Sequence, residues 1–270
     1  MTGACLVTGG GGGIGAALCR RLGGAGHLVL VAGRDQERCE SVAAAVRAAG
    51  GAAHALAIDV ADERSIAAAV ARARELCGPA VPIEGLVNNA GMAESAPLHA
   101  VRDEQGQDVF ERHMQVNFHG ARRLVQALLA EMKVKQRGRI VNVASSAGLR
   151  GYAYVAAYCA SKHALVGYTR AAALELAGTG VTMNAVCPHY VDSPMTEAAV
   201  RRVVQKTKKS EADTRKFFAA QNPGGRLVTV DQVAEAVLEL YSGEQNGVIL
   251  ELTGSETLRV GEARAMKGGS

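Results

Sequence analysis

Short apolar stretches alternate with longer amphipathic stretches along the whole chain. The apolar stretches predict strands at 4–8, 27–32, 53–58, 84–88, 138–143, 181–186 and 247–252. The helical spacing of apolar residues between them predicts helices at 14–24, 35–49, 63–77, 103–135, 157–178, 195–220 and 230–241. This alternation predicts a doubly wound α/β fold, in which helices cover both faces of a parallel seven-stranded sheet. Such folds bind their ligands at the carboxyl ends of the strands.

The segment from Tyr158 to Lys162 carries the strongest chemical signal. Positions i and i+4 share a face of the helix predicted there, so the Tyr158 phenol and the Lys162 ammonium project the same way. A nearby cation favours the phenolate, so we expect the pKa of Tyr158 to fall from about 10 toward neutrality. A phenol tuned in this way can exchange a proton at about neutral pH. Ser145 stands 13 residues earlier, after the fifth predicted strand.

A glycine-rich turn follows the first predicted strand directly. Residues 8–15 read Thr-Gly-Gly-Gly-Gly-Gly-Ile-Gly, and a predicted helix begins at Ile14. Glycine lets the backbone turn tightly and approach a phosphate, and the free N–H groups at a helix start attract anions. A flexible linker is the alternative, but linkers are rarely bracketed by a buried strand and a helix. The turn therefore predicts a phosphate site that involves Gly9, Gly13, Ile14 and Gly15.

With both motifs in this order, the chain resembles the single-domain branch of the short-chain dehydrogenase/reductase family, from Thr2 to about Gly254. Besides the glycine-rich turn (T-G-x-x-x-G-I-G), the resemblance rests on Asp59-Val60, Asn88-Asn89-Ala90-Gly91, Asn117 with Gly120, Ser145, Tyr158 with Lys162, and the stretch from Pro188 to Met195. It implies one Rossmann-fold domain over residues 1–254, with a substrate lid at about 194–222 and a tail at 255–270. It also implies a homotetramer.

The resemblance implies a role for each catalytic residue. Tyr158 would pass a proton to or from the substrate oxygen, and Lys162 would lower the Tyr158 pKa and hold the nicotinamide ribose. Ser145 would hydrogen-bond the reacting carbonyl oxygen, and the family's spacing to the tyrosine favours it over Ser146. Asn117 would hold a water that links Lys162 to solvent.

Cofactor choice depends on the end of the second predicted strand. A carboxylate there would bind ribose hydroxyls and repel a 2′-phosphate, but the chain carries Gly33 followed by Arg34. A guanidinium pairs well with a phosphate, so NADP(H) is predicted over NAD(H). In the alternative, Arg34 is a solvated loop charge and Asp35 supplies the missing acid. Asp59 could instead cap the helix that begins near Asp62. The resemblance adds the cofactor contacts Asp59, Val60, Asn89, Ala90, Gly91, Tyr158, Lys162, Pro188, Val191 and Ser193.

His189 departs from the family pattern, which has glycine at this place. A glycine there often needs a backbone conformation that side chains resist, so His189 either narrows the pocket or binds a polar substrate group. A tolerated loop histidine is the alternative. Aromatic side chains expected to line or close the pocket are Tyr152, Tyr154, Tyr190, Phe217 and Phe218.

The lid segment carries seven cations against three anions. In a chain of net charge +4, this excess favours an anionic partner, such as a coenzyme A or acyl-carrier thioester. A surface that is basic only for solubility is the alternative.

Composition agrees with one large α/β domain, since 48% of the 270 residues are hydrophobic. The mild net charge of +4 does not indicate nucleic-acid binding. Six scattered cysteines without a C-x-x-C pair predict reduced thiols in the cytoplasm, with neither disulfides nor a metal site. No apolar run reaches the roughly 20 residues that a membrane-spanning helix needs.

Together these features predict an NADPH-dependent ketone/secondary-alcohol oxidoreductase. A 3-oxoacyl or polyketide thioester is the leading substrate, because residues 139–195 resemble the family's ketoreductases. A dehydrogenase of a cyclic, aromatic or steroid alcohol is the alternative. A non-catalytic nucleotide-sensing regulator is a second one, but such proteins commonly lose the tyrosine or lysine that this chain retains.

Overall fold

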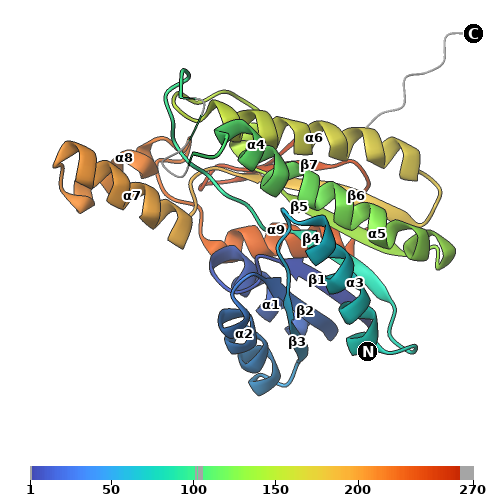
Figure 1. The fold of residues 1–270 in the computed structure, drawn as a ribbon. Helices are drawn as coiled ribbons and strands as arrows, with labels where there is room; N and C mark the ends of the chain where they lie inside the picture. Colours follow the sequence, from blue (N-terminus) through green and yellow to red (C-terminus); the bar gives the residue numbers. More distant parts are fainter. Residues whose placement is uncertain (1, 101, 103–105, 262–270) are drawn as a thin grey trace, which may run out of the picture.

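A single sheet runs through the centre of the computed structural model, which describes residues 2–100, 102 and 106–261, and helices cover both of its faces (Figure 1). The strand order is β3-β2-β1-β4-β5-β6-β7-β8. Strands β1 to β7 pair in parallel, and β8 pairs antiparallel with β7. The predicted doubly wound fold is therefore confirmed. The strands are β1 (Thr2–Thr8), β2 (His27–Gly33), β3 (Ala52–Ala57), β4 (Ile83–Asn88), β5 (Gly138–Val143), β6 (Val181–Pro188), β7 (Ile249–Leu252) and β8 (Thr257–Gly261).

The predicted count of seven strands is wrong, because the described residues form eight. Strand β8 lies within the predicted tail 255–270, and the turn before it contains Gly254 with a φ of 96°. An edge strand paired on one side buries little, and Leu258 and Val260 remain 39% and 42% exposed. The apolar pattern that marks the central strands is therefore absent here. Residues 262–270 of the predicted tail lie outside the described part of the chain.

The helices agree with most of the predicted ranges. They are α1 (Gly13–Gly24), α2 (Gln36–Ala48), α3 (Glu63–Cys77), α4 (Val109–Met114), α5 (Gly120–Val134), α6 (Ala156–Leu176), α7 (Pro194–Thr207), α8 (Glu211–Ala220) and α9 (Val230–Ser242). A π-helical turn, η1 (Gln115–His119), joins α4 to α5, and a 3₁₀ turn, η2 (Ser146–Gly148), follows β5. Among the described residues, no helix combines the length and the apolar character that crossing a bilayer requires.

Two predicted helices differ because short polar side chains cap the backbone. The helix predicted at 103–135 begins only at Val109, since the Asp108 carboxylate accepts the N–H of Glu111, while residues 103–105 lie outside the described part. The helix predicted at 195–220 is two helices. Lys208 adopts a left-handed φ of 57° after α7, and the Ser210 hydroxyl caps α8. Neither break interrupts the apolar periodicity, so the pattern alone does not reveal it.

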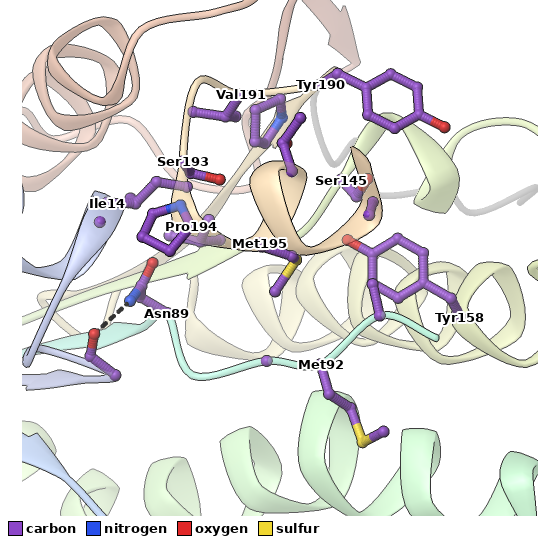
Figure 2. Close-up of a pocket in the computed structure, with 18 of the residues that line it drawn as sticks. Ile14, Asn89, Met92, Ser145, Tyr158, Tyr190, Val191, Ser193, Pro194 and Met195 are labelled. Atoms are coloured by element: carbon purple, nitrogen blue, oxygen red, sulfur yellow. Dashed lines mark hydrogen bonds between the residues drawn. The ribbon is translucent and has the colours of Figure 1, made fainter. Parts of the chain in front are cut away.

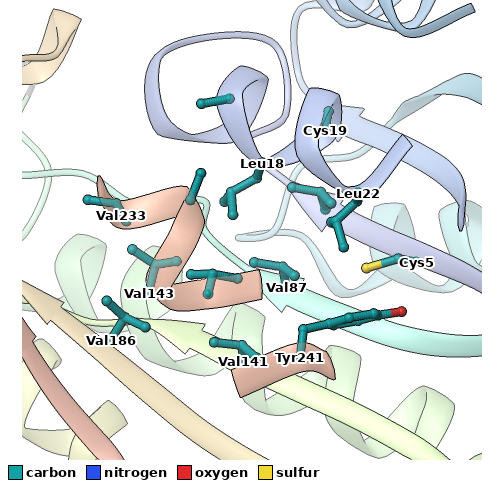
Figure 3. Packing of buried hydrophobic residues seen from close by; sticks show 14 of the residues in the cluster. Cys5, Leu18, Cys19, Leu22, Val87, Val141, Val143, Val186, Val233 and Tyr241 are labelled. Carbon is teal, nitrogen blue, oxygen red and sulfur yellow. The ribbon is translucent and has the colours of Figure 1, made fainter. Parts of the chain in front are cut away.

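Alternate residues of the central strands build two separate cores. In β1, Cys5 and Val7 point to the face covered by α1, α2 and α9, whereas Ala4 and Leu6 point to the face covered by α3 and α5. Figure 3 shows the first core, in which Leu18, Leu22, Val87, Val141, Val233 and Tyr241 come together. Both faces of the central strands are therefore filled mostly with apolar side chains, as expected for a parallel sheet covered on both sides.

Candidate active site

A cavity of about 1000 Å³ opens at the carboxyl ends of the parallel strands (Figure 2). Its wall contains the glycine turn after β1, the end of β2, the segment after β4, the loop after β5 and the segment from Pro188 to Met195 after β6. Helix α7 forms a further side. The motifs found in the sequence thus meet mostly at one edge of the sheet, as the topology requires.

Helix α1 begins at this cavity without a side-chain cap. Its N-cap is Gly12, which has no side chain to accept the first N–H groups, and its first turn contains no acid. In contrast, an Asp, Ser or Thr side chain caps each of the helices α2, α3, α4, α8 and α9. The N–H groups at the start of α1 are therefore available to an anion, as in the phosphate sites of nucleotide-binding folds.

Close packing fixes the shape of the glycine turn. Gly9 has a φ of 64°, and a Cβ on Gly15 would lie 2.0 Å from the Gly9 carbonyl oxygen. The Asn89 amide donates to the carbonyl oxygens of Thr8 and Gly9, at 3.0 and 3.2 Å. The Thr8 hydroxyl in turn accepts the N–H groups of Asn89 and Ala90, both at 3.0 Å. Asn89 and Ala90 thus hold the turn in place, and Gly15 packs behind it.

The opposite end of the glycine turn adjoins two arginines. Arg34 and Arg38 both line the cavity, together with Gly33 and Asp35. The Asp35 carboxylate is already engaged, since it caps α2 and pairs with the Arg38 Nε at 3.1 Å. Arg34 is exposed and has no hydrogen bond or ion pair with the described residues. Asp35 is thus poorly placed to act as the substitute acid, and Arg34 remains available to a phosphate.

Asp59 and Val60 follow β3, beside this end of the cavity, but are not part of its wall. Asp59 accepts the N–H of Ala61 at 2.9 Å, and Asp62 rather than Asp59 caps α3. The sequence alternative of an Asp59 helix cap is therefore wrong. The expected contact of this pair with the cofactor stays a prediction.

Tyr158, Ser145 and Lys162 meet at the other end of the cavity. Figure 2 shows the Tyr158 hydroxyl turned toward Ser145 across the gap between α6 and the loop after β5. The Lys162 ammonium donates to the Val143 carbonyl oxygen at 2.9 Å and lies 5.8 Å from the centre of the Tyr158 ring. Tyr152 donates its hydroxyl proton to Ser146 at 2.9 Å. The Ser145 hydroxyl accepts the Ala147 N–H at 3.1 Å and also hydrogen-bonds Tyr158, so of the two neighbouring serines it is Ser145 that is coupled to the Tyr158 phenol.

Burial controls the titration of this pair. It raises the pKa of Tyr158 to about 12, although hydrogen bonding with Ser145 partly offsets the rise. It lowers the pKa of Lys162 to about 8. The expected fall of the Tyr158 pKa is thus wrong for this arrangement of side chains, because desolvation of the phenolate outweighs the effect of a cation 5.8 Å from the ring centre. Near neutral pH the phenol carries its proton.

Asn117 lies in the π-helical turn η1, a type of irregularity common at functional sites. Its Oδ1 accepts the Met92 N–H at 2.8 Å, and its Nδ2 donates to the Met92 carbonyl and the Ser161 hydroxyl, at 3.0 and 2.9 Å. Ser161 then donates to the Tyr158 carbonyl at 2.8 Å. Both N–H groups of the amide are therefore used to tie the segment after β4 to α6. The expected water relay stays a prediction, and these N–H groups are not free to serve it.

Gly91 is the residue of the Asn88–Gly91 segment that lies nearest to this cluster. A Cβ at this position would approach the Asn117 Oδ1 to 3.2 Å and the Lys162 Nζ to 3.6 Å. A side chain here would therefore press on the Asn117 amide and contact the Lys162 ammonium. The sequence motif places glycine where the backbone passes close to both groups.

Thr8, Ser161 and His113 are among the buried polar residues that received no role from the sequence. Thr8 and Ser161 are neighbours of assigned motif positions, so their place in the chain was the available signal. His113 gave no signal in the sequence. It is fully buried, its Nδ1 bonds the Val109 carbonyl at 2.6 Å, and its Nε2 accepts the Glu94 N–H at 3.2 Å. Because Nε2 accepts, Nδ1 carries the proton. The ring centres of His113 and Tyr158 lie 6.4 Å apart.

His189 lines the cavity, but one nitrogen of its imidazole is engaged with another side chain. Its backbone is not left-handed, so the position does not demand glycine in this chain. The His189 Nε2 pairs with the Glu251 carboxylate at 2.7 Å, and their side chains are 2% and 3% exposed. Arg150 also pairs with Glu251. The imidazole Nε2 therefore joins the end of β6 to β7, and the expected contact of His189 with a substrate group stays a prediction.

Aromatic side chains cover part of the cavity, but not all of those expected. Tyr152, Tyr190 and Phe218 line it, and the rings of Tyr190 and Phe218 lie 4.9 Å apart. Tyr154 is 71% exposed and lies outside this cavity, with a left-handed φ of 65°. Its expected place in the wall is wrong, because this backbone turn directs it outward. Phe217 is 55% exposed and does not line the cavity either.

The remaining predicted cofactor residues lie along the segment after β6. Pro188, Val191 and Ser193 all line the cavity. Ser193 is the N-cap of α7, yet its hydroxyl makes no capping bond and so remains available to a ligand. Pro194 of the same segment packs near Gly13, since a Cβ on Gly13 would lie 3.2 Å from the Pro194 Cδ.

The wall fits a phosphorylated nicotinamide dinucleotide. The uncapped start of α1 suits a pyrophosphate, Arg34 and Arg38 suit a further phosphate, and the hydroxyl of Ser193 lies free near the other end. The volume of about 1000 Å³ is at the upper end of small-molecule sites and leaves room for a second ligand. Within the described residues, no three His, Cys, Asp or Glu side chains gather as metal ligands would.

Comparison with known proteins agrees with this geometry. The model of the family described as short chain dehydrogenase matches residues 4–203. The "Granaticin polyketide synthase putative ketoacyl reductase 1" of Streptomyces violaceoruber is 36% identical over 243 residues, which span 90% of this chain and 88% of that protein. The cis-4-hydroxycyclohexanecarboxylate dehydrogenase of Sinomonas cyclohexanicum is 36% identical over 256 residues, 93% of this chain and 95% of that protein. The crystal structure of an actinorhodin polyketide ketoreductase variant with NADPH matches with a TM-score of 0.86 at 35% identity, covering 94% of this chain and 97% of that one.

Proposed function

The chain belongs to the short-chain dehydrogenase family and is an oxidoreductase, and we propose that it reduces a 3-oxoacyl or polyketide thioester with NADPH. The observation that carries the proposal is the convergence of Ser145, Tyr158 and Lys162 in one cavity, at the far end from an uncapped helix start and two arginines. The named ketoacyl reductase and polyketide ketoreductase relatives support the substrate class.

In the proposed mechanism, each residue of the cluster acts on the substrate carbonyl or on its partner residue. When bound, the reduced nicotinamide supplies a hydride to the carbonyl carbon. Tyr158, whose pKa of about 12 keeps it protonated, donates its proton to the carbonyl oxygen, which yields the alcohol. Ser145 donates a hydrogen bond to the same oxygen as negative charge builds there. The Lys162 ammonium stabilises the phenolate that remains.

NADPH is the proposed cofactor because of the charge at the end of β2. Arg34 lines the cavity without a partner among the described residues, and the single acid beside it, Asp35, is paired with Arg38. A 2′-phosphate would meet a net positive surface here, whereas no free carboxylate stands ready for the ribose hydroxyls of NADH. The related polyketide ketoreductase was solved with NADPH, which also supports this choice.

Replacing Arg34 with glutamine should therefore weaken NADPH selectively. One charge-assisted contact to a phosphate contributes about 1.5–3 kcal/mol, so we expect the KM for NADPH to rise by roughly 10- to 100-fold. The KM for NADH should change by less than about twofold, because NADH lacks the group that Arg34 contacts. Steady-state kinetics with both cofactors measure the effect. Arg20→Gln, on the exposed surface of α1 outside the cavity, is the matched control. Equal losses for both cofactors would contradict the assignment.

The substrate can be tested directly by the loss of NADPH absorbance in the presence of acetoacetyl-CoA or a bulky cyclic ketone such as trans-decalone. Rapid turnover of the thioester with NADPH, and slow turnover with NADH, is the expected result. A dehydrogenase of a cyclic alcohol is the second candidate, which the relative that acts on a hydroxycyclohexane carboxylate favours. If only the cyclic ketone is turned over, the proposed thioester reductase is wrong and a dehydrogenase of a cyclic alcohol takes its place.

Assembly is proposed on the family resemblance, and location on the six free cysteines. We expect a homotetramer that shares α4, α5 and α6 and the last strands, located in the cytoplasm. Light scattering of the purified protein would give the oligomeric state.

A further inference from the structure

One face of α7 lines the cavity from the reactive end outward. Met195, Ala199, Arg202 and Lys206 lie at successive intervals of four, three and four residues, which places them on one side of the helix. At a rise of about 1.5 Å per residue, Arg202 and Lys206 stand about 10 and 16 Å along the axis from Met195. Figure 2 shows Met195 at the centre of the pocket, and Figure 1 shows α7 and α8 projecting from the body of the protein. The face is therefore apolar at the reactive end and cationic at the outer end.

Both cations keep their charge free for a ligand. Arg202 donates to the Ala93 carbonyl oxygen at 3.2 Å, a neutral partner in the segment after β4. Among the described residues, neither Arg202 nor Lys206 belongs to an ion pair. Two acids that precede them in the sequence, Asp192 and Glu197, both pair with Arg215, and the two that follow, Glu211 and Asp213, lie in the first turn of α8 and do not line the cavity. Of the residues that line the cavity, Asp35 is the one carboxylate, and it lies at the opposite end, paired with Arg38.

The other cations of the α7–α8 segment do not share this position. Arg215 is neutralised by its two acids, and Arg201, Lys208, Lys209 and Lys216 are exposed and do not line the cavity. A basic surface needed only for solubility would have no reason to place two cations on the cavity face. The seven-to-three excess seen in the sequence thus resolves into two cations that line the cavity and five that do not.

We propose that Arg202 and Lys206 form a subsite for the phosphate ester of a pantetheine arm, which carries the acyl substrate into the cavity. The inference rests on the proposed function and names how that substrate would be held. A thioester whose carbonyl lies at Ser145 and Tyr158 would extend past the apolar residues Met195 and Ala199 toward the outer end of α7. Guanidinium and ammonium groups at that end match a phosphate in charge and in hydrogen-bond donors. Coenzyme A and a phosphopantetheinylated carrier protein both present this group.

The test compares two substrates that differ by one phosphate, the acetoacetyl thioesters of 4′-phosphopantetheine and of pantetheine. For Arg202→Gln/Lys206→Gln we expect the KM for the phosphorylated thioester to rise about tenfold or more, and that for the pantetheine thioester to change less than about twofold. The kcat should stay nearly constant, since neither residue touches the reacting atoms. The matched control is Arg201→Gln/Lys209→Gln, which removes the same charge from the outward face and should leave both KM values unchanged. Acetoacetyl-CoA and the acetoacetyl carrier protein are assayed in parallel. The one whose KM rises in the same way in Arg202→Gln/Lys206→Gln is the carrier whose phosphate the subsite binds.

Each other outcome overturns a defined part of the argument. The subsite is overturned if the KM values of both thioesters change equally, or if neither changes. It is also overturned if the control variant shows the same rise in KM, because total charge alone would then explain the effect. The proposed function would then stand, since the wild-type protein still reduces the thioester. If the wild-type protein binds NADPH but reduces neither thioester, the proposed function fails and the subsite fails with it.

Discussion

Tyr158→Phe should remove nearly all turnover and leave NADPH binding intact. The change deletes one oxygen, and with it the phenolic proton donor that hydrogen-bonds Ser145. General acid catalysis contributes about 10²–10⁴-fold to a rate, and we expect kcat to fall by at least that factor. The ring itself keeps its edge contact with His113 and its place near Lys162. NADPH affinity, measured by fluorescence titration, should therefore change by less than about twofold.

Tyr168→Phe is the matched control, because it makes the same chemical change on the same helix, α6, outside the cavity. It should leave kcat within about twofold of the wild type. If Tyr158→Phe kept its rate, the acid would have to be another group. A different result would favour a nucleotide-sensing regulator over an enzyme. In that case the wild type would bind NADPH but reduce none of the ketones tested, and Tyr158→Phe would keep all its binding properties.

The parts of this site that the sequence predicts are those encoded by short spacings. Tyr158 and Lys162 share a helix face because four residues make about one turn. The glycine turn could be placed because an apolar strand and an amphipathic helix flank it, and both follow from periodicity over a few residues. Once the strands are assigned, parallel pairing brings their carboxyl ends together, so the motifs converge without any further information.

Features that depend on distant partners leave no signal in the local sequence. His189 meets Glu251, 62 positions away, and this contact rather than the departure from glycine decides what the imidazole does. Asn117 meets Met92 and Ser161 through a π-helical turn that no apolar pattern reveals. These pairings arise only when the sheet has brought the segments together.

The error in the Tyr158 pKa has a different physical origin. The spacing to Lys162 predicts correctly that a cation lies nearby, but the size of its effect depends on how deeply both groups are buried. In the structure desolvation dominates and raises the pKa of the phenol to about 12. Local spacing specifies neighbours, whereas burial is a property of the whole fold. The split between α7 and α8 and the extra strand β8 were missed for a related reason, since capping bonds and edge pairing leave little trace in an apolar pattern.

Gly15→Ala should both destabilise the protein and abolish NADPH binding. The new Cβ would lie 2.0 Å from the Gly9 carbonyl oxygen and 2.9 Å from the Asn89 Nδ2, and the first of these atoms belongs to the backbone. No side-chain rotation can relieve such a contact, so the turn after β1 must open. Overpacking of this kind costs about 3 kcal/mol or more. For a chain of this size, that loss should lower Tm by about 6–12 °C.

The glycine turn itself supplies the control for this prediction. A Cβ on Gly12 would meet no atom within 4 Å, and the φ of 178° there is extended backbone that any residue adopts. Gly12→Ala should therefore keep its Tm within about 2 °C of the wild type in the absence of cofactor. Differential scanning calorimetry of the two variants separates packing within the turn from contact with the cofactor. Equal Tm values for Gly15→Ala and Gly12→Ala would mean that the turn yields easily. In that case the contact between Gly9 and Gly15 could not be what holds the phosphate site in shape.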